Sequence, residues 1–266
     1  MLESIDRKKY LKNIFIKKIS ILFTQIFIVL SIIISWELLA YFNIIDSFIT
    51  STPSRVVATL INLSNNGLLS HVGVTCIETI IGFVSGTVIG IIVAIMLWWS
   101  NFLAKVMDPF LVVLNSLPKI ALGPIIIIWV GAGMPAIIVM ALCISLIVTI
   151  IQILNGFLDT DKEKIKMAKT FNASKLQILL KIVIPANIST VISSLKINIG
   201  LSLVGVISGE FLVSKAGLGY LIVYGGQVFQ LDLVMASVII LGIMAALLYQ
   251  SVVILEKVIK KVNKFI

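Results

Sequence analysis

Residues 74–98 read VTCIETIIGFVSGTVIGIIVAIMLW, and this run decides the class of fold. It contains one charged side chain, that of Glu78. About 20 consecutive apolar residues are enough for a helix to cross a bilayer. A buried helix of a soluble all-α protein normally keeps a polar face, which this run lacks. The run therefore predicts a membrane-spanning helix.

The rest of the chain repeats the pattern. Of 266 residues, 59% are apolar and 12% are charged, whereas about a quarter are charged in soluble domains. The mean hydropathy is +1.16. We expect an all-α integral membrane protein with about six spans, at 19–42, 74–98, 109–130, 135–157, 186–210 and 232–255. The third and fifth spans are interrupted by Pro118, Pro124 and Gly200. Such residues are tolerated in spans because neighbouring helices can satisfy the backbone groups that they leave free.

The N-terminus carries a basic tail, residues 1–18, followed by the first span. A signal peptide also begins with basic residues, but the apolar run here is longer than a signal core and lacks a small-x-small cleavage site. We interpret 19–42 as a retained span, and 43–266 as the core domain.

Lysine and arginine residues predict the orientation. The chain has 21 of them and a net charge of +9. Those beside the predicted spans on one side are Arg7, Lys8, Lys9, Lys12, Lys17, Lys18, Lys105, Lys162, Lys164, Lys166, Lys169, Lys175, Lys181, Lys257, Lys260, Lys261 and Lys264. The opposite loops hold Arg55 and Lys215. This asymmetry predicts a multi-pass protein of the cell membrane with both termini in the cytoplasm, and gives no reason to expect a nucleic-acid partner.

Small residues mark one helix face. Gly82, Gly86 and Gly90, here called the glycine ridge, recur every four residues, a spacing that lets another helix approach closely. We favour packing within the chain over a dimer contact. Cys76 and Cys143 lie in apolar runs and are interpreted as small buried side chains, with no disulfide and no metal.

The loop between the fourth and fifth spans, residues 159–185, reads DTDKEKIKMAKTFNASKLQILLKIVIP. Thr160 and Glu163 have the spacing of a capping box that would begin one helix. Asn172 suits the left-handed turn that ends it. Ser174 and Gln177 form a second box. The pattern predicts two short helices joined by a sharp corner.

The second helix of the loop has a predicted apolar face before Pro185 marks the start of the next span. The face comprises Leu176, Leu179, Leu180, Val183 and Ile184. A solvated charged loop with an interfacial helix is the alternative interpretation.

The stretch Ala168–Ser174, followed by Ile184 and Pro185, resembles the EAA loop of binding-protein-dependent ABC importer permeases. In that family the pattern is Glu-Ala-Ala, then Gly after three residues, then an apolar-Pro pair. Here Lys166 takes the Glu position and Asn172 the Gly position. The resemblance implies a coupling helix that docks on an ATPase subunit. It assigns to that contact Lys166, Met167, Ala168, Lys169, Phe171, Asn172, Ala173, Ser174 and Pro185, and we call residues 159–185 the coupling loop.

Other stretches resemble the same family, in particular the permeases for nitrate, sulfonates, taurine and vitamin precursors. They are Thr52-Pro53-Ser54, Asp108-Pro109, Leu117–Pro124, Gly131–Gly133, Glu210 and Gly217–Tyr220. The resemblance implies a type I importer fold and two permease subunits, as a homodimer or a heterodimer, with a homodimer expected. It also implies an external solute-binding protein and two ATPase subunits that carry ATP and Mg²⁺, with no cofactor on this chain.

Ionisable residues within spans are costly and usually face a cavity or a partner. Those at or within the predicted spans are Glu37, Glu78, Lys119, Lys196 and Glu210. One hypothesis is that Lys119, Lys196 and Glu210 line a route for a small polar or anionic solute. The alternative is that they form structural ion pairs.

Two other functions fit the sequence less well. A secondary transporter needs carboxylates in broken helices and often an inverted repeat, and an intramembrane enzyme needs a catalytic constellation that the sequence does not display. The single histidine, His71, is interpreted as an interfacial polar residue. The sequence also contains no GxxxxGK[ST] motif. We therefore expect a non-enzymatic permease whose ATP is hydrolysed by a partner, with an ion-driven transporter as the alternative.

Overall fold

The computed structural model describes residues 2–65 and 67–263, and every regular element in these ranges is a helix. Five of the described helices are long and apolar enough to span a bilayer. They are α1 (Leu2–Tyr41), α4 (Leu68–Trp99), α7 (Met134–Leu158), α11 (Ile188–Val213) and α13 (Leu231–Asn263). They confirm the first, second, fourth, fifth and sixth predicted spans, and the fifth continues through Gly200 without a break.

The third predicted span is broken. It consists of α5 (Asn101–Ser116), a 3₁₀ turn (Lys119–Leu122) and α6 (Gly123–Val130), with an angle of 84° across the break. Leu117 has an extended ψ of 138°, as expected for a residue before a proline, where the helical conformation clashes with the ring. Pro118 therefore sets the position of the break.

The predicted start of this segment, at residue 109, is wrong. Helix α5 begins at Asn101, where the hydroxyl of Ser100 accepts a hydrogen bond from the Leu103 N–H at 3.3 Å. Pro109 lies inside the helix rather than at its start. The cap at Ser100 satisfies an orphan N–H at the helix terminus, and Ser100 alone separates α5 from the end of α4.

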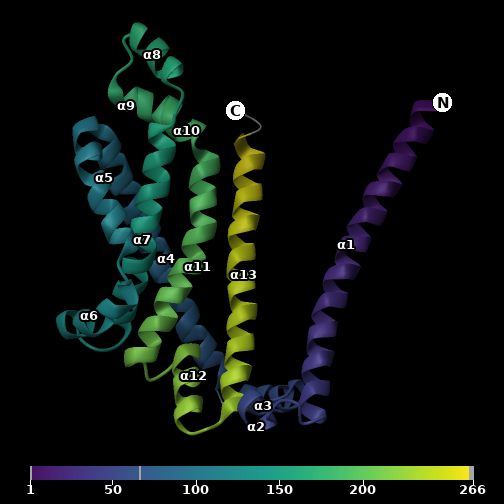
Figure 1. Cartoon of the computed structure of the whole chain (residues 1–266). Helices are drawn as coiled ribbons and strands as arrows, with labels where there is room; N and C mark the ends of the chain where they lie inside the picture. The colour runs from purple at the N-terminus through teal and green to yellow at the C-terminus, as the bar shows by residue number, and fades with distance from the viewer. Residues whose placement is uncertain (1, 66, 264–266) are drawn as a thin grey trace.

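Both termini lie at the same end of the helix bundle, together with the coupling loop (Figure 1). This loop comprises α8 (Lys162–Thr170), α9 (Lys175–Ile178), a π-helical turn (Leu179–Val183) and α10 (Ile184–Ala186). We call this the basic end, since the lysine-rich segments meet here. At the opposite end lie α6, α12 (Leu218–Gln227), α2 (Ser47–Thr50) and α3 (Pro53–Asn65).

The core of the bundle is made by α4, α7 and α11, which pack against one another. The glycine ridge of α4 faces α7, where Cβ atoms built on its glycines would lie 2.7–2.8 Å from side-chain atoms of Ala141, Ser145 and Thr149. On α11, a Cβ at Gly205 would overlap the backbone of Ala141. Small residues thus let the three helices approach closely, and the predicted packing within the chain is confirmed.

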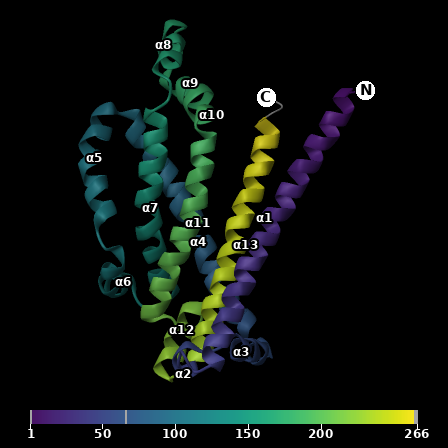
Figure 2. The ribbon, with the colours of Figure 1, turned by 45° about the vertical axis from the view of Figure 1, so that its right-hand side comes forward.

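Helix α1 stands away from this core over most of its length (Figures 1 and 2). None of its most apolar 18-residue window is buried. The predicted basic tail and first span form this one continuous helix. It is held near its end, where the Glu37 carboxylate accepts hydrogen bonds from the Ser54 N–H (3.1 Å) and hydroxyl (2.8 Å).

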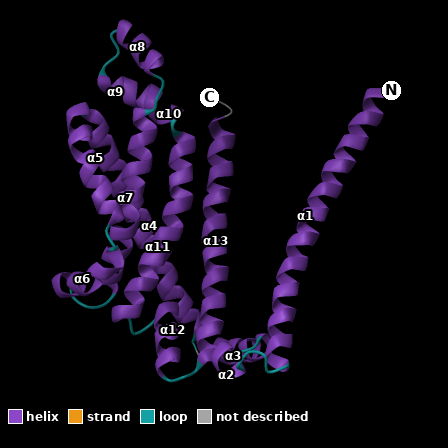
Figure 3. Cartoon of the chain, viewed as in Figure 1, coloured by secondary structure: helices purple, strands orange, loops and turns teal. Residues whose placement is uncertain are grey.

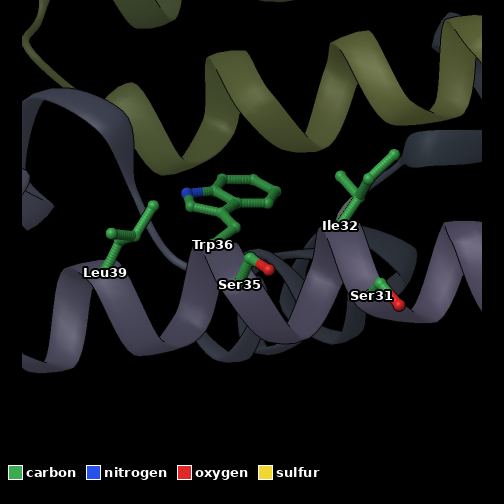
Figure 4. A pocket seen from close by; sticks show the side chains of 5 residues that line it. All are labelled: Ser31, Ile32, Ser35, Trp36 and Leu39. Carbon is green, nitrogen blue, oxygen red and sulfur yellow. The ribbon is translucent and has the colours of Figure 1, made fainter.

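A shallow hollow of about 380 Å³ on α1 is lined by five side chains of that single helix, among them Trp36. Figure 4 shows the indole of Trp36 standing up from the helix, with Ile32 and Leu39 on either side. A hollow with one helix for a wall encloses nothing, so it is an open flank of α1 rather than a binding site.

The ribbon coloured by secondary structure shows how little loop connects these elements (Figure 3). The longest helices run the full height of the bundle, while the short helices lie at its two ends. Polar functional groups are therefore expected where the short helices meet the ends of the long ones, since the backbone is irregular there.

Candidate functional site

The coupling loop begins with a cap that differs from the predicted one. Asp161, not Thr160, caps α8, because its carboxylate accepts a hydrogen bond from the Glu163 N–H at 2.9 Å. The Thr160 hydroxyl donates to the Gly156 carbonyl (3.4 Å) and accepts from the Asn187 amide (2.7 Å). The predicted Thr160–Glu163 box is therefore wrong, because a tertiary contact occupies the hydroxyl.

The corner of the loop has the predicted geometry. Asn172 adopts a positive φ of 54°, the left-handed conformation that asparagine tolerates better than most residues. The Ser174 hydroxyl accepts from the Gln177 N–H (3.3 Å), and the Gln177 side chain accepts from the Ser174 N–H (2.8 Å). Both bonds of the second capping box are thus present, so α9 starts where the sequence placed it.

The second half of the coupling loop packs into the core. The apolar face predicted from the sequence is only partly the face that is buried. Ile178, Leu179 and Val183 are 3%, 4% and 0% exposed, whereas Leu176 and Leu180 are 53% and 55% exposed. Assigning Leu176 and Leu180 to the buried face was wrong. A π-helical turn at residues 179–183 changes the angular spacing of the side chains, so the simple 3.6-residue pattern does not hold.

The buried roots of the loop join a cluster built from α4, α5 and α7. Its other buried members are Ala94, Leu97, Trp98, Leu111, Ile150, Ile153, Leu154 and Phe157. Interiors of this kind are close-packed, so the base of the coupling loop and the ends of α4, α5 and α7 form one packed unit.

Two polar contacts, which sequence reasoning missed, fasten the loop at its edges. The Asn187 amide donates to the Thr160 hydroxyl and to the Val183 carbonyl (2.8 Å), joining the two ends of the loop. The Lys175 ammonium donates to the Trp99 carbonyl and lies 5.9 and 5.5 Å from the ring centres of Trp98 and Trp99. The Trp-Trp pair at the end of a predicted span was the available signal for an interfacial anchor.

The tip of the loop is open. Met167 and Phe171 are 58% and 78% exposed. Lys166 and Lys169 are also exposed, while Ala168 is partly covered. Helix α8 projects beyond the ends of the spans (Figure 1). Exposed large apolar residues on a protruding helix are typical of a contact surface. Of the remaining predicted loop residues, Ala173 packs on the core cluster and Pro185 lies in α10.

At the opposite end of the bundle, Glu210 is buried to 1% exposure. Its carboxylate accepts hydrogen bonds from the Thr75 hydroxyl (2.6 Å) and the Gly219 N–H (2.5 Å). The Thr75 hydroxyl in turn accepts from the Leu218 N–H at 2.8 Å. These bonds join α4, α11 and the start of α12, and they satisfy two of the orphan N–H groups at the α12 N-terminus.

The same end contains two further ionisable residues. His71 Nδ1 accepts a hydrogen bond from the Gly217 N–H (3.0 Å), and its ring stacks on Tyr220 at 6.0 Å. Glu78 is 3% exposed on α4. His71 is therefore a partner in helix packing at this end of the bundle. We name the group formed by His71, Thr75, Glu78, Glu210 and Gly217–Gly219 the outer polar network.

The lysines predicted to line a pathway lie elsewhere. The Lys119 ammonium donates to the Asn115 carbonyl (2.8 Å) at the break between α5 and α6, beside an apolar hollow of about 200 Å³. The Lys196 ammonium pairs with Glu256 of α13 at 2.5 Å. Lys196 and Glu210 are 14 positions apart on α11, about 21 Å along a helix. The structure therefore does not bring the three predicted residues into one cluster.

The fold is that of the membrane subunit of a type I ABC importer. A chain of the MetNI methionine ABC transporter, solved in inward-facing conformations, superposes with a TM-score of 0.64 over 73% of this chain and 95% of that one, at 19% identity.

The protein belongs to the family described as "Binding-protein-dependent transport system inner membrane component", whose model matches residues 86–262. A probable ABC transporter permease protein of Haemophilus influenzae is 31% identical, over 82% of this chain and 88% of its own length. The putative aliphatic sulfonates permease SsuC of Bacillus subtilis is 24% identical over 86% and 84%. The taurine permease TauC of Escherichia coli is 22% identical over 80% of each chain. The resemblance noted in the sequence is thereby confirmed, and the protein is a multi-pass ABC importer permease.

Proposed function

We propose that this permease forms the translocation pathway for a small polar or anionic solute, and that a separate ATPase subunit drives it through the coupling loop. One observation carries the proposal. The loop presents exposed Met167 and Phe171 at its tip, while its base is buried among the ends of α4, α5 and α7. We call this arrangement a lever, because a rigid-body displacement of α8 would be transmitted through the buried base of the loop to the spans.

The capped corner gives the lever its stiffness. The turn at Asn172 and the paired bonds between Ser174 and Gln177 fix the angle between α8 and α9. The Asn187–Thr160 contact joins the ends of the loop. A rigid-body shift of α8 would therefore reach the buried Ile178 and Val183 with little loss in bending. ATP and Mg²⁺ would be bound by the ATPase, and this chain would supply the mechanical contact alone.

The proposed assembly contains two copies of this chain, two ATPase subunits and an external solute-binding protein, in the cell membrane. We place the basic end, with both termini, in the cytoplasm. The support is the excess of lysine at that end, since lysine and arginine near the spans set orientation. The ATPases would then meet α8, and the binding protein would meet the opposite end. In this assembly 43–266 is the permease core domain, and the first span stands outside it.

The solute class rests on the relatives. Their names include permeases for aliphatic sulfonates, taurine, formylaminopyrimidine and riboflavin. We propose a solute of the nitrate, sulfonate, taurine or vitamin-precursor class. Among the candidate pathway residues, the position of Lys119 at a broken helix supports a role best, because irregular backbone within a membrane usually lines a cavity.

Uptake measurements test the pathway residues. Lys119→Ala is expected to reduce uptake more than Lys196→Ala, because Lys196 is already paired with Glu256. Glu210 is the third residue to test, through Glu210→Gln. Normal assembly with unchanged uptake in all three variants would remove them from the pathway.

Copurification tests the coupling. The permease is expressed with its candidate ATPase, solubilised and captured by a tag on the ATPase. The double variant Ala168→Glu, Phe171→Asp should lose the complex. A matched variant, Phe229→Asp, places the same change on an equally open phenylalanine at the opposite end, which is 71% exposed. It should leave capture intact.

If the unmodified permease never captures an ATPase, and the double variant still transports, the coupling assignment is wrong. An ion-gradient-driven transporter then becomes the better interpretation. If both variants lose the complex equally, the contact is not localised to the loop.

A further inference from the structure

A second feature of the basic end is a hollow of about 640 Å³ behind the coupling helix. Its walls come from the ends of α4 and α7, the start of α5, and the inner side of α8 and α9. It therefore lies at the base of the coupling loop, on the side that faces the helix ends, and it shares Lys166, Lys169 and Ala173 with the residues assigned to the ATPase contact.

The hollow has an apolar floor. Trp98, Phe157 and Ile178 line it and are 8%, 1% and 3% exposed. Trp99, beside it, is 43% exposed. Tryptophan is enriched at the boundary between hydrocarbon and water, where its amphipathic ring fits. The floor is thus suited to an apolar chain arriving from the membrane.

The rim of the hollow is basic. Its lysines are Lys162, Lys166, Lys169 and Lys175, all exposed. None of them forms an ion pair with a carboxylate among residues 10–64 and 67–261, whose side chains the structure describes. By contrast, the neighbouring Lys164 lies 3.9 Å from Asp161. The Lys175 ammonium donates to the Trp99 carbonyl, while Lys162, Lys166 and Lys169 bring three further positive charges to the same rim. An anion in the hollow would be attracted by these charges. We call this site the lysine pocket.

The lysine pocket continues into a groove between α5 and α7. The groove has a volume of about 370 Å³ and shares Asn101 and Leu158 with the pocket. It continues along Ala104 and Leu154, which are 6% and 4% exposed. Lys105 and Asp108, of opposite charge, also line it. The pocket and the groove thus adjoin at Asn101 and Leu158, and the groove offers apolar surface beside the polar side chains of Asn101, Lys105, Asp108 and Asn155.

We propose that the lysine pocket binds the phosphate headgroup of an anionic phospholipid from the adjacent leaflet, with an acyl chain in the groove between α5 and α7. A basic pocket between spans at one face of the membrane has the chemistry that binds anionic headgroups. The floor and the groove favour a lipid over a free phosphate, because a soluble anion would leave both apolar surfaces uncovered.

Such a lipid would contact both α8 and α5. It would neutralise the lysines of the inner face of the coupling loop and tie the loop to the broken third span. The proposal does not depend on ATPase coupling, since the lipid contacts this chain alone.

Tryptophan fluorescence tests the proposal, because Trp98 lines the pocket and Trp99 adjoins it. In a Trp36→Phe, Trp129→Phe background, the full-length chain is reconstituted in phosphatidylcholine vesicles. Brominated phosphatidylglycerol or brominated phosphatidylcholine is then titrated in. The anionic quencher is expected to act at a lower mole fraction than the zwitterionic one.

Matched variants locate the site. Lys166→Gln with Lys169→Gln removes two rim charges and should reduce the preference for the anionic lipid by about tenfold or more, since each basic side chain near an anionic surface adds substantially to binding. Lys164→Gln with Lys181→Gln removes the same charge from the same loop outside the pocket, and should retain the preference. Asn101→Phe fills the junction of pocket and groove, leaves every lysine in place, and should also lose it.

Equal quenching by the two lipids in the parent protein would overturn the proposal. So would equal loss in the two lysine variants, which would indicate general surface attraction. If millimolar inorganic phosphate abolishes the preference, the occupant is a soluble anion. If the preference disappears in the complex with the ATPase, the lysines contact that subunit instead. Either result replaces the lipid, and neither bears on whether the chain is an importer permease.

Discussion

The two ends of the bundle differ in the burial and hydrogen bonding of their polar side chains. At the end that carries α12, Glu210 and Thr75 are buried and hydrogen-bonded to backbone N–H groups. At the basic end, the polar side chains of α8 are exposed, and Phe171 beside them is open to solvent. At the α12 end, the buried side chains of Glu210 and Thr75 find their partners within the chain, although Oε2 of the buried Glu78 has none. The basic end instead presents exposed groups that are open to an external partner.

This difference separates structural charges from contact charges. A buried carboxylate whose bonds are all made within the chain stabilises the fold, and its removal leaves unpaired donors. Exposed lysines and an exposed phenylalanine add little to folding and are available for binding. Substitutions in the outer polar network should therefore lower stability, and those at the tip of the coupling loop should lower partner affinity.

The largest expected effect is at Gly217. Its φ is +114°, and a Cβ built there would overlap the carboxylate of Glu210. Gly217→Ala should destabilise the protein by about 3 kcal/mol or more, since backbone strain and a displaced buried carboxylate add together. Thermal unfolding of the purified protein in detergent measures the change.

The control is Gly242→Ala on α13, where nothing lies within 4 Å of the added methyl group. It should be neutral or slightly stabilising, because alanine is the better helix former. Equal destabilisation by both substitutions would show that the outer polar network has no special rigidity.

A smaller loss is expected at Thr75. Thr75→Val keeps the shape but removes the hydroxyl that donates to Glu210 and accepts from the Leu218 N–H. The buried N–H left unpaired should cost about 1–3 kcal/mol. Thr79→Val, one turn along the helix, is the matched variant, since its hydroxyl bonds only within α4, to the Thr75 carbonyl. Unfolding curves of the two variants should separate, and coinciding curves would contradict the network.

At the tip of the coupling loop, a substitution should lower partner affinity and leave stability nearly unchanged. Phe171→Ala removes a side chain that is 78% exposed, so the free energy of unfolding should change by less than about 0.5 kcal/mol. Its affinity for the proposed ATPase should fall by about tenfold or more, as for an aromatic anchor in an interface. Titration of the ATPase onto immobilised permease measures the affinity. A variant that unfolds early but binds normally would reverse the assignment of the two ends.

The smallest effect concerns an ion pair at the network's own end. Arg55 pairs with Asp232 at 2.7 Å, with 47% and 25% of the two side chains exposed. Arg55→Gln should cost about 0.5 kcal/mol at low salt, because exposed pairs contribute little. The cost should diminish at high salt as screening increases. A loss as large as that of Thr75→Val would mean that exposure does not distinguish the two kinds of charge.

Much of the fold could be predicted from local sequence. A long apolar run is enough to indicate a span, and a proline within such a run indicates where the span can break. The corner of the coupling loop was also predictable, because Asn172, Ser174 and Gln177 act within a few residues of one another. In each case the atoms that determine the structure are neighbours in the chain.

The errors occurred where a distant residue intervened. Thr160 did not cap α8, because Asn187, 27 positions away, occupies its hydroxyl. Leu176 and Leu180 are exposed, because a π-helical turn changes which side chains face the core. Ile178 and Val183 pack against α4 and α7 in their place. The partners of Glu210 and Lys196 could not be predicted either, since they lie on other helices. A single sequence contains no signal for such pairings.

Helix α1 also bears on how the protein is made. Its apolar face does not rely on the other spans for burial, so it can enter the membrane and remain there as soon as it is synthesised. Its N-terminal half carries Lys17 and Lys18 together with the other basic residues of the tail. In the orientation proposed above, these residues would retain that end on the side of synthesis. Biogenesis thus starts from an element that contributes little to the folded core.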